Sequence, residues 1–395
     1  MIRLILLLTF LESFASVLVQ RGCYFASKAH LRFAENDNLW LAFVMGLCYV
    51  TGSLVSHAAT QRWGERRVLL SVLGLQIAVC IATMWQPAPT LLFVGIGLIG
   101  LLHGVKWPLV ESLVCANQTP REIAATLGKF NVTWSAAIAP SVVVVGPLVR
   151  LGYRPLWLVA AGISLVGVGL AWRLPARASH LPDDHPERPP EERMVRYRGL
   201  LTASRSLLLT SYALLWLLAA LMPDILERLG VPPLSWWSPA PSAVLDVVRV
   251  AGFALLGCWT GWHNRSWPLV AAMLGIPISF ALAVAGPSLW VSLGGQAFFG
   301  LFGVLVYYAA LYYAMVVKNA AVDAGGWHEA LIGLGSIVGP ASGLLGIQVA
   351  GSRLSGPIAT ILGTIPLLIG CLAVAVWHVR PMRTPGQRGS GRAPE

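Results

Sequence analysis

Long apolar runs, separated by short segments of glycine, proline and charged residues, recur along all 395 residues of this chain. A helix needs about 20 mostly apolar residues to cross the hydrocarbon layer of a membrane, and twelve runs approach or exceed that length. Only 11% of the residues are charged, whereas soluble domains carry roughly 25%. The pattern predicts an all-α polytopic membrane protein with twelve transmembrane helices. The predicted spans are 2–20, 39–59, 67–85, 89–115, 129–149, 155–173, 206–223, 242–261, 267–286, 288–316, 327–350 and 355–378.

The distribution of lysine and arginine over the loops predicts an orientation. With both termini in the cytoplasm, the cytoplasmic segments hold 18 of the 28 Lys and Arg residues and the outer loops hold 7. Because positive loops stay on the cytoplasmic side, we predict a multi-pass protein of the cell (inner) membrane with cytoplasmic N and C termini. The segment 1–20 leaves an alternative open, since a basic start followed by an apolar run is also typical of a signal peptide.

Several other classes of protein are disfavoured. The net charge is +11, but the arginines lie in short loops between apolar runs, where membrane orientation explains them better than nucleic-acid binding. The six cysteines are scattered without metal-ligand spacing, "WHEALIG" departs from the HExxH zinc motif, and no phosphate-binding glycine loop is present. We therefore expect a monomer in the lipid bilayer with no nucleic-acid partner, no cofactor and no bound metal.

The positions of several glycine and proline residues repeat after 200 residues. The shift brings Pro87 onto Pro287, Gly95 onto Gly295, Gly100 onto Gly300, Pro140 onto Pro340 and Gly146 onto Gly346. Parallel repeats of this kind predict two pseudo-symmetric six-helix bundles with a binding site between them near the middle of the membrane. The predicted domains are an N-terminal bundle (1–173), a Pro-rich cytoplasmic linker (174–205), a C-terminal bundle (206–378) and a disordered cytoplasmic tail (379–395).

The short charged stretch "HAATQRWGERR" lies between the second and third predicted spans. Together with six plus six spans and a long inner linker, it resembles the major facilitator superfamily, whose loop signature is roughly G-x-x-x-D-[RK]-x-G-[RK]-[RK]. Arg62, Gly64 and Arg66 match, whereas His57 replaces the first glycine and Gln61 replaces the aspartate. The resemblance implies an inner lock formed by this loop, with the charge pairing weakened by Gln61.

Glu12 and Lys106 are charged residues of opposite sign inside predicted spans. Glu12 in span one and Lys106 in span four lie at similar depths, about 15 and 14 Å from the inner ends. The resemblance implies that spans one, four, seven and ten line a central cavity, so we expect a Glu12–Lys106 pair that faces it and couples proton or anion binding to helix movement. A purely structural buried pair is the alternative. His103, three residues before Lys106, is either a proton relay or an ordinary hydrogen-bonded residue.

Aromatic residues gather at the same depth in the two halves. Trp107 corresponds to Tyr307 in the repeat, and Tyr308 and Tyr312 are one helical turn apart. We expect these four side chains to form an aromatic wall for an organic solute, with plain helix packing as the alternative.

Charged residues near the inner ends of spans four, five and eleven suggest a gate. Glu111 and Lys129 are expected to form a short inner bridge, and Lys129 corresponds to Glu329 in the repeat, so opposite charges occupy equivalent positions. An ordinary interfacial charge is the alternative. Pro140 and Pro340 are expected to kink their helices.

The sequence predicts a secondary active transporter that moves a small solute by alternating access with H⁺ as coupling ion, and not an enzyme. One alternative is a non-transporting membrane sensor or scaffold with a transporter-like fold. Another is a membrane-embedded transferase, for which Asp183, Asp184 and Glu187 in the linker would be the acidic residues.

Overall fold

The computed structural model describes residues 2–178, 190–232, 235–318, 322–350 and 356–379. All of the regular structure in these ranges is helical. The first half holds α1 (Ile2–Gln20), α2 (Gly22–Leu31), α3 (Glu35–Trp63), α4 (Glu65–Met84), α5 (Pro89–Cys115), α6 (Pro120–Leu151) and α7 (Arg154–Ala171). The second half holds α8 (Glu191–Arg228), the 3₁₀ helix η1 (Ala240–Ala243), α9 (Val244–Cys258), α10 (Trp267–Ala285), α11 (Leu289–Val317), α12 (Val322–Ala350) and α13 (Gly356–Val379).

Among the described residues, twelve segments are long and apolar enough to cross a membrane. The prediction of twelve spans is therefore confirmed, and most predicted boundaries agree within a few residues. The first span is longer than predicted, because α1 continues almost directly into α2 and ends at Leu31. The polar residues of α2 are accommodated by partners, as when the Ser27 hydroxyl donates to Asn38 Oδ1 at 2.8 Å.

The predicted linker 174–205 is too long at its C-terminal end. Helix α8 begins at Glu191, because Met194, Tyr197 and Leu201 recur at helical spacing and are buried. Residues 179–189, and the tail from residue 380, lie outside the described residues.

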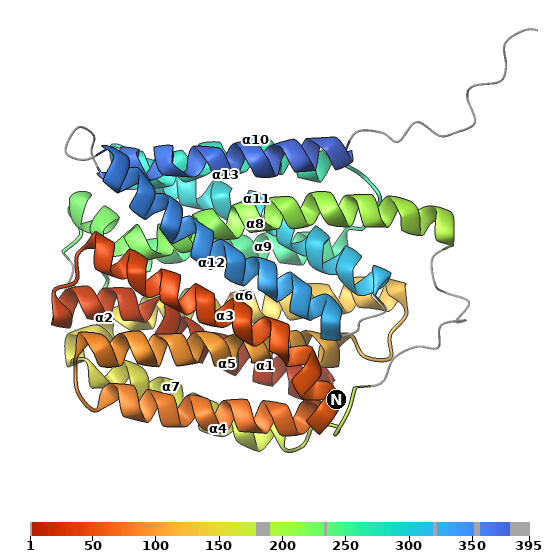
Figure 1. Cartoon of the computed structure of the whole chain (residues 1–395), viewed down its shortest axis with the longest axis horizontal. Coiled ribbons are helices and arrows are strands. Elements are labelled where there is room, and N and C mark those ends of the chain that lie inside the picture. Colours follow the sequence, from red (N-terminus) through yellow and green to blue (C-terminus); the bar gives the residue numbers. More distant parts are fainter. Residues whose placement is uncertain (1, 179–189, 233–234, 319–321, 351–355, 380–395) are drawn as a thin grey trace, which may run out of the picture.

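The chain folds into two helical halves that lie side by side. In Figure 1, α1 to α7 form the lower half and α8 to α13 the upper half, with helix axes running across the view. The halves meet mainly where α3 packs along α12 and α6 packs along α9. We call the ends near Gly64, where α3 gives way to α4, the Arg-rich face, and the ends near the α2–α3 turn the opposite face.

The 200-residue repeat has a direct structural counterpart. A Cβ atom on Gly100 would lie 2.4 Å from the carbonyl oxygen of Met45, and a Cβ on Gly300 would lie 2.5 Å from that of Leu245. Met45 and Leu245 are themselves 200 residues apart. Because only glycine permits this backbone approach, the same helix crossing, α3 with α5 and α9 with α11, is built in both halves.

Candidate functional site

A cavity with a volume of about 120 Å³ lies between the two halves. Side chains from both halves line it, including Ser16, Trp107 and Glu111 from the first half and Arg249 and Tyr307 from the second. The cavity has room for several waters or a small solute. It occupies the position expected for a solute site between two parallel repeats.

The expected aromatic wall is present in part. Trp107 and Tyr307, the pair related by the repeat, both line the cavity. Tyr308 and Tyr312 do not: Tyr308 packs on Trp262, and Tyr312 stacks on His263 with ring centroids 4.3 Å apart. Their helical positions turn them away from the face of α11 that carries Tyr307.

The wall is completed by aromatic residues that the sequence reading left out. The Trp134 ring lies 5.3 Å from Tyr307, and Tyr212 lies 6.0 Å from the same ring, both measured between centroids. Trp134 and Tyr212 line the cavity from α6 and α8. Their contribution depends on helix packing, so no local sequence pattern could have selected them.

The structure brings Glu12 and Lys106 together in the first half. Lys106 Nζ lies 2.7 Å from Glu12 Oε2, and the side chains are 0% and 1% exposed. Lys106 also donates to Ser16 Oγ at 3.2 Å and to Gln76 Oε1 at 3.1 Å. Every ammonium proton therefore has an acceptor, which is the condition for keeping such a charge in the interior.

This pair lies behind the cavity wall rather than in it, which differs from the expectation. Neither Glu12 nor Lys106 lines the cavity, and Lys106 lies 5.1 Å from the ring of Trp107, which does. On the side of the pair that faces away from the cavity, Gln76 of α4 and Gly167 of α7 contact Glu12. A Cβ on Gly167 would lie 2.7 Å from Glu12 Oε1. The pair thus belongs to the interior of the first half.

A hydrogen-bond network nevertheless connects the pair to the cavity. His103 Nδ1 lies 2.9 Å from Gln20 Nε2, and His103 Nε2 lies 3.3 Å from Ser16 Oγ and 3.1 Å from Gln76 Oε1. Gln20 and Ser16 line the cavity, whereas His103 is 0% exposed. His103 therefore lies between the cavity and the pair, and its role as a proton relay stays a prediction.

The cavity also has a cationic part. Arg249 lies 3.5 Å from Asp246, donates to the Tyr212 hydroxyl at 3.3 Å, and lies over the Trp134 ring at 4.8 Å. Arg21, at the end of α1, forms an ion pair with the same Asp246. Asp246 and Arg249 are three residues apart on α9, whereas Arg21 lies 225 residues away from Asp246 in the chain.

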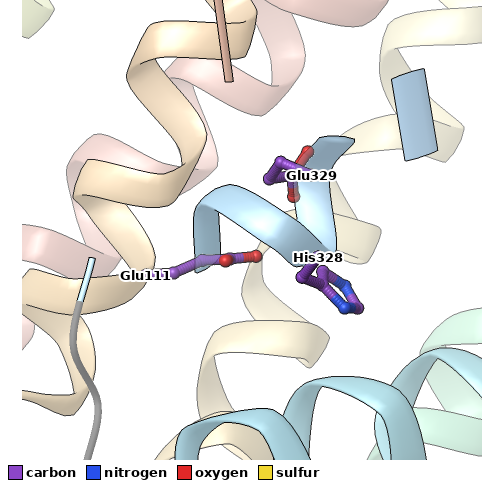
Figure 2. Close-up of side chains that lie close together, drawn as sticks. All are labelled: Glu111, His328 and Glu329. Atoms are coloured by element: carbon purple, nitrogen blue, oxygen red, sulfur yellow. The ribbon is translucent and has the colours of Figure 1, made fainter. Parts of the chain in front are cut away.

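An acidic cluster lies toward the Arg-rich face. Glu111 on α5 and Glu329 on α12 are 1% and 4% exposed, and both line the cavity. The Tyr49 hydroxyl donates to Glu329 Oε2. Figure 2 shows Glu111 reaching from its helix toward the turn of α12 that carries His328 and Glu329. His328 and Tyr49 were missed by the sequence reading.

The expected charge pairing of the gate is not formed in this conformation. Lys129 is exposed on α6, and among the described residues no ion pair joins it to Glu111 or Glu329. Instead, the two carboxylates face each other across the interface between α5 and α12. Helix rotation decides this arrangement, because Glu111 points inward while Lys129 points to the outside.

The two halves touch on both sides of the cavity. On the opposite face, Lys28 of α2 forms ion pairs with Asp224 and, at 2.8 Å, with Glu227 of α8. Toward the Arg-rich face, a Cβ on Gly128 of α6 would lie 2.9 Å from the Cα of Gly257 on α9. The cavity is therefore bracketed by contacts that would have to separate for a solute to enter or leave.

The sequence of most of the chain matches one known protein family. The family model described as Major Facilitator Superfamily matches residues 5–340. The chain belongs to the Major Facilitator Superfamily. It is thus a multi-pass membrane transporter of small solutes, a class that is typically non-enzymatic.

Solved structures of this superfamily share the fold. The human organic anion transporter MFSD10 (TETRAN) superimposes with a TM-score of 0.66 at 12% identity, covering 95% of this chain and 99% of that one. The nucleoside transporter NupG superimposes with a TM-score of 0.65 at 10% identity, covering 95% and 98%. A search of curated proteins found no significant match. At these identities the similarity establishes the architecture alone.

The loop between α3 and α4, which resembles the superfamily signature, turns at Gly64. Gly64 takes a positive φ of 79° between the two helices, which favours glycine. Arg66 donates to the carbonyl of Leu174 at 3.2 Å, and Arg62 lies over the Trp63 ring at 5.3 Å. Gln61 Nε2 lies 3.1 Å from His57 Nε2. The two residues that depart from the superfamily signature therefore contact each other.

Two other expectations concern helix shape and the linker. Pro140 and Pro340 lie inside the continuous helices α6 and α12, and bending at these positions during transport stays a prediction. Asp183, Asp184 and Glu187, the acidic residues considered for a transferase, lie outside the described residues.

Proposed function

We propose that this superfamily member is a secondary active transporter that couples the movement of a small organic solute to H⁺. The solute would bind in the cavity against Trp107, Tyr307 and Trp134, with Arg249 available to an anionic or acceptor group. The contacts that bracket the cavity would open alternately. We also propose that both termini are cytoplasmic in the cell membrane, so that the Arg-rich face is the inner face.

A single unpartnered oxygen carries the proton part of the proposal. Glu12 Oε2 accepts from Lys106 and Gln76, but Glu12 Oε1 is buried with no hydrogen-bond partner among the described residues. A proton on Oε1 would neutralise the carboxylate while Oε2 keeps its donors. Because the Lys106 charge would then lack its counter-ion, protonation changes the energy of the whole network.

The network gives this change a route to the cavity. Ser16 and Gln20 contact His103 and also line the cavity, so a solute that contacts them reorganises the hydrogen bonds around Glu12. The energetic coupling is then reciprocal: a solute that favours one protonation state is itself bound better in that state. If protonation does not alter solute binding, no coupling exists.

The test uses purified protein in liposomes that contain a pH-sensitive dye. Solutes that raise the thermal stability of the protein are added first, and proton movement is then recorded under an imposed pH gradient. We expect solute-dependent proton movement by the wild type, and solute binding without proton movement by Glu12→Gln. Glu191→Gln, which changes an exposed carboxylate far from the network and from the contacts that bracket the cavity, serves as the matched control.

Two results would contradict the proposal in different ways. Proton movement by Glu12→Gln at the wild-type rate would remove Glu12 from coupling. Binding of solutes by the wild type without any transport, in either direction, would favour the alternative of a sensor with a transporter fold.

A further inference from the structure

The acidic cluster contains more unpartnered polar atoms than the charge network of the first half. A carboxylate oxygen of Glu111, a ring nitrogen of His328 and a carboxylate oxygen of Glu329 all lie within 4.8 Å of one another. All three residues are buried, and His328 is 0% exposed. The cluster joins α5 of the first half to α12 of the second half, as Figure 2 shows.

The unpartnered atoms are available to bind a ligand. Within the part of the chain that the structure describes, Glu111 Oε2 and both ring nitrogens of His328 are buried without hydrogen-bond partners. A buried polar atom that loses water without gaining a partner costs about 1–3 kcal/mol. Three such atoms in one place are therefore expected to bind something.

Protons alone account for only part of this arrangement. A proton shared by Glu111 and Glu329 would reduce the repulsion between the two carboxylates. It would leave the imidazole of His328 without a partner. A divalent cation balances both carboxylate charges and also accepts the lone pair of an imidazole nitrogen. Mixed histidine and carboxylate ligation suits Zn²⁺, Mn²⁺ and Co²⁺ rather than Mg²⁺ or Ca²⁺.

We propose that Glu111, His328 and Glu329 bind one divalent transition-metal ion between α5 and α12. Two ligand atoms about 2.1 Å from one ion lie at most ~4.2 Å apart. A separation of 4.8 Å, the upper limit for these atoms, would therefore have to close by at least about 0.6 Å, and by about 1.4 Å to reach the ~3.4 Å spacing of a tetrahedral site, which side-chain rotation supplies.

Neighbouring residues hold the proposed ligands in place. The Tyr49 hydroxyl donates to Glu329 and orients its carboxylate, which is the usual role of a residue that hydrogen bonds to a metal ligand. The Tyr307 ring packs edge-on against His328 with centroids 4.9 Å apart. Gly325 leaves space beside the cluster, since a Cβ there would lie 2.8 Å from Glu111 Oε2.

The position of the site gives the ion a regulatory effect. Its ligands come from both halves, so a bound ion would clamp α5 to α12 and oppose their separation. This consequence rests on the proposed function, whereas the binding of the ion does not. We expect the metal-bound protein to unfold at a higher temperature and to transport more slowly than the metal-free protein.

The test is a titration of the full chain, purified in detergent without a tag and freed of metal by a chelator. Co²⁺ serves as the probe, followed by its visible d–d absorption, and Zn²⁺ binding is measured by calorimetry. We expect one ion per chain for the wild type, and affinity at least ~10-fold weaker for Glu329→Gln and His328→Gln. Tyr49→Phe, which keeps every ligand, should weaken binding by about 10-fold. His263→Gln changes a histidine outside the cluster and should leave binding unchanged.

The inference fails if the wild type binds no Co²⁺, or if its thermal stability changes with pH but not with added Co²⁺ or Zn²⁺. It also fails if Glu329→Gln and His328→Gln bind the ion as the wild type does, because the ion is then elsewhere. Should His328→Gln not fold, Glu329→Gln and Tyr49→Phe decide the outcome. Solute-driven proton movement in chelator-treated liposomes tests the proposed function separately, so either proposal can fail alone.

Discussion

Two buried groups of polar residues lie close to the same cavity, and they differ in how well they are satisfied. In the first, the Glu12–Lys106 pair lies within one half and Lys106 has three acceptors. In the second, Glu111 and Glu329 come from different halves and share the space with a histidine that has no partner among the described residues. Burial is nearly complete in both.

This difference in hydrogen bonding indicates where a transporter can keep buried charged residues. In the proposed alternating access the halves move as units, so residues within one half keep the same neighbours and a full set of hydrogen bonds can be built once. Residues across the interface gain and lose neighbours as the halves move. Incomplete satisfaction at that interface is therefore tolerable, and it leaves atoms free for a ligand.

The largest expected effect comes from removing the cation of the satisfied pair. Lys106→Met leaves Glu12 buried without its counter-ion, and we expect a loss of about 3–5 kcal/mol in the free energy of unfolding. Unfolding of the detergent-solubilised protein by denaturant measures this loss. Glu329→Gln, by contrast, removes a like charge from the acidic cluster and should cost nothing or stabilise the protein in metal-free buffer.

Two further variants test the origin of the Lys106 effect. Glu12→Gln combined with Lys106→Met removes both charges and should recover most of the lost stability. Lys318→Met breaks an exposed ion pair with Asp323 and should cost less than about 1 kcal/mol. Equal losses for Lys106→Met and Lys318→Met would mean that the buried pair has no special role.

A pair of glycines offers a second and smaller test. A Cβ on Gly167 would lie 2.7 Å from Glu12 Oε1, and a Cβ on Gly325 would lie 2.8 Å from Glu111 Oε2 and 3.1 Å from Pro108 Cα. We expect each change to alanine to cost about 1–3 kcal/mol by overpacking. Gly167→Ala should impair proton movement, and Gly325→Ala should weaken Co²⁺ binding.

The control for these changes is Gly162→Ala, on the same helix as Gly167, where a Cβ meets nothing within 4 Å. Alanine there should be neutral or stabilise the helix by up to about 1 kcal/mol. If Gly167→Ala and Gly325→Ala impaired the same function equally, the two groups would act as one site.

The smallest expected effect concerns an imidazole outside the membrane-spanning segments. His263, in the connection between α9 and α10, is partly buried with Nε2 unpartnered among the described residues. Burial lowers the pKa of His263 to about 4, from 6.5. The unfolded chain therefore binds the proton more readily, so the stability contributed by neutral His263 is complete above about pH 6.5 and is lost as pH falls toward 4.

We expect His263→Asn to flatten the pH dependence of unfolding between pH 7 and pH 5 by about 1 kcal/mol or less, since partial exposure screens the effect. Thermal unfolding of the two proteins at both pH values measures the difference. An identical pH dependence in the two proteins would contradict this assignment.

Much of the architecture could be predicted because membrane spans depend on local composition. The run 89–115 was predicted to the residue, since Pro89 starts α5 and apolar residues make up most of it as far as Cys115. The end of the first span and the start of α8 were wrong. Lys28 pairs with Asp224 of the other half, and the fold buries Met194, Tyr197 and Leu201, and neither contact can be inferred from local composition.

The contacts of the site were predictable where they depend only on how deep a residue lies along its membrane span. Glu12 and Lys106 could be paired because each is the charged residue at a matching depth in an apolar span, and the structure brings them together. Glu111 was expected to meet Lys129 and instead meets Glu329. Depth was similar for both candidates, and the direction of each side chain around its helix decided between them.

The amino-acid order by itself determined the twelve spans, the 200-residue repeat and the presence of charge within the membrane, because each depends on residues close together in the chain or on a simple shift. Only the tertiary structure decided which side chains face the cavity, which lie behind its wall, and which carboxylates meet across the two halves. The reason is geometric: one residue along a helix turns a side chain by about 100°, so small differences in helix rotation exchange one partner for another.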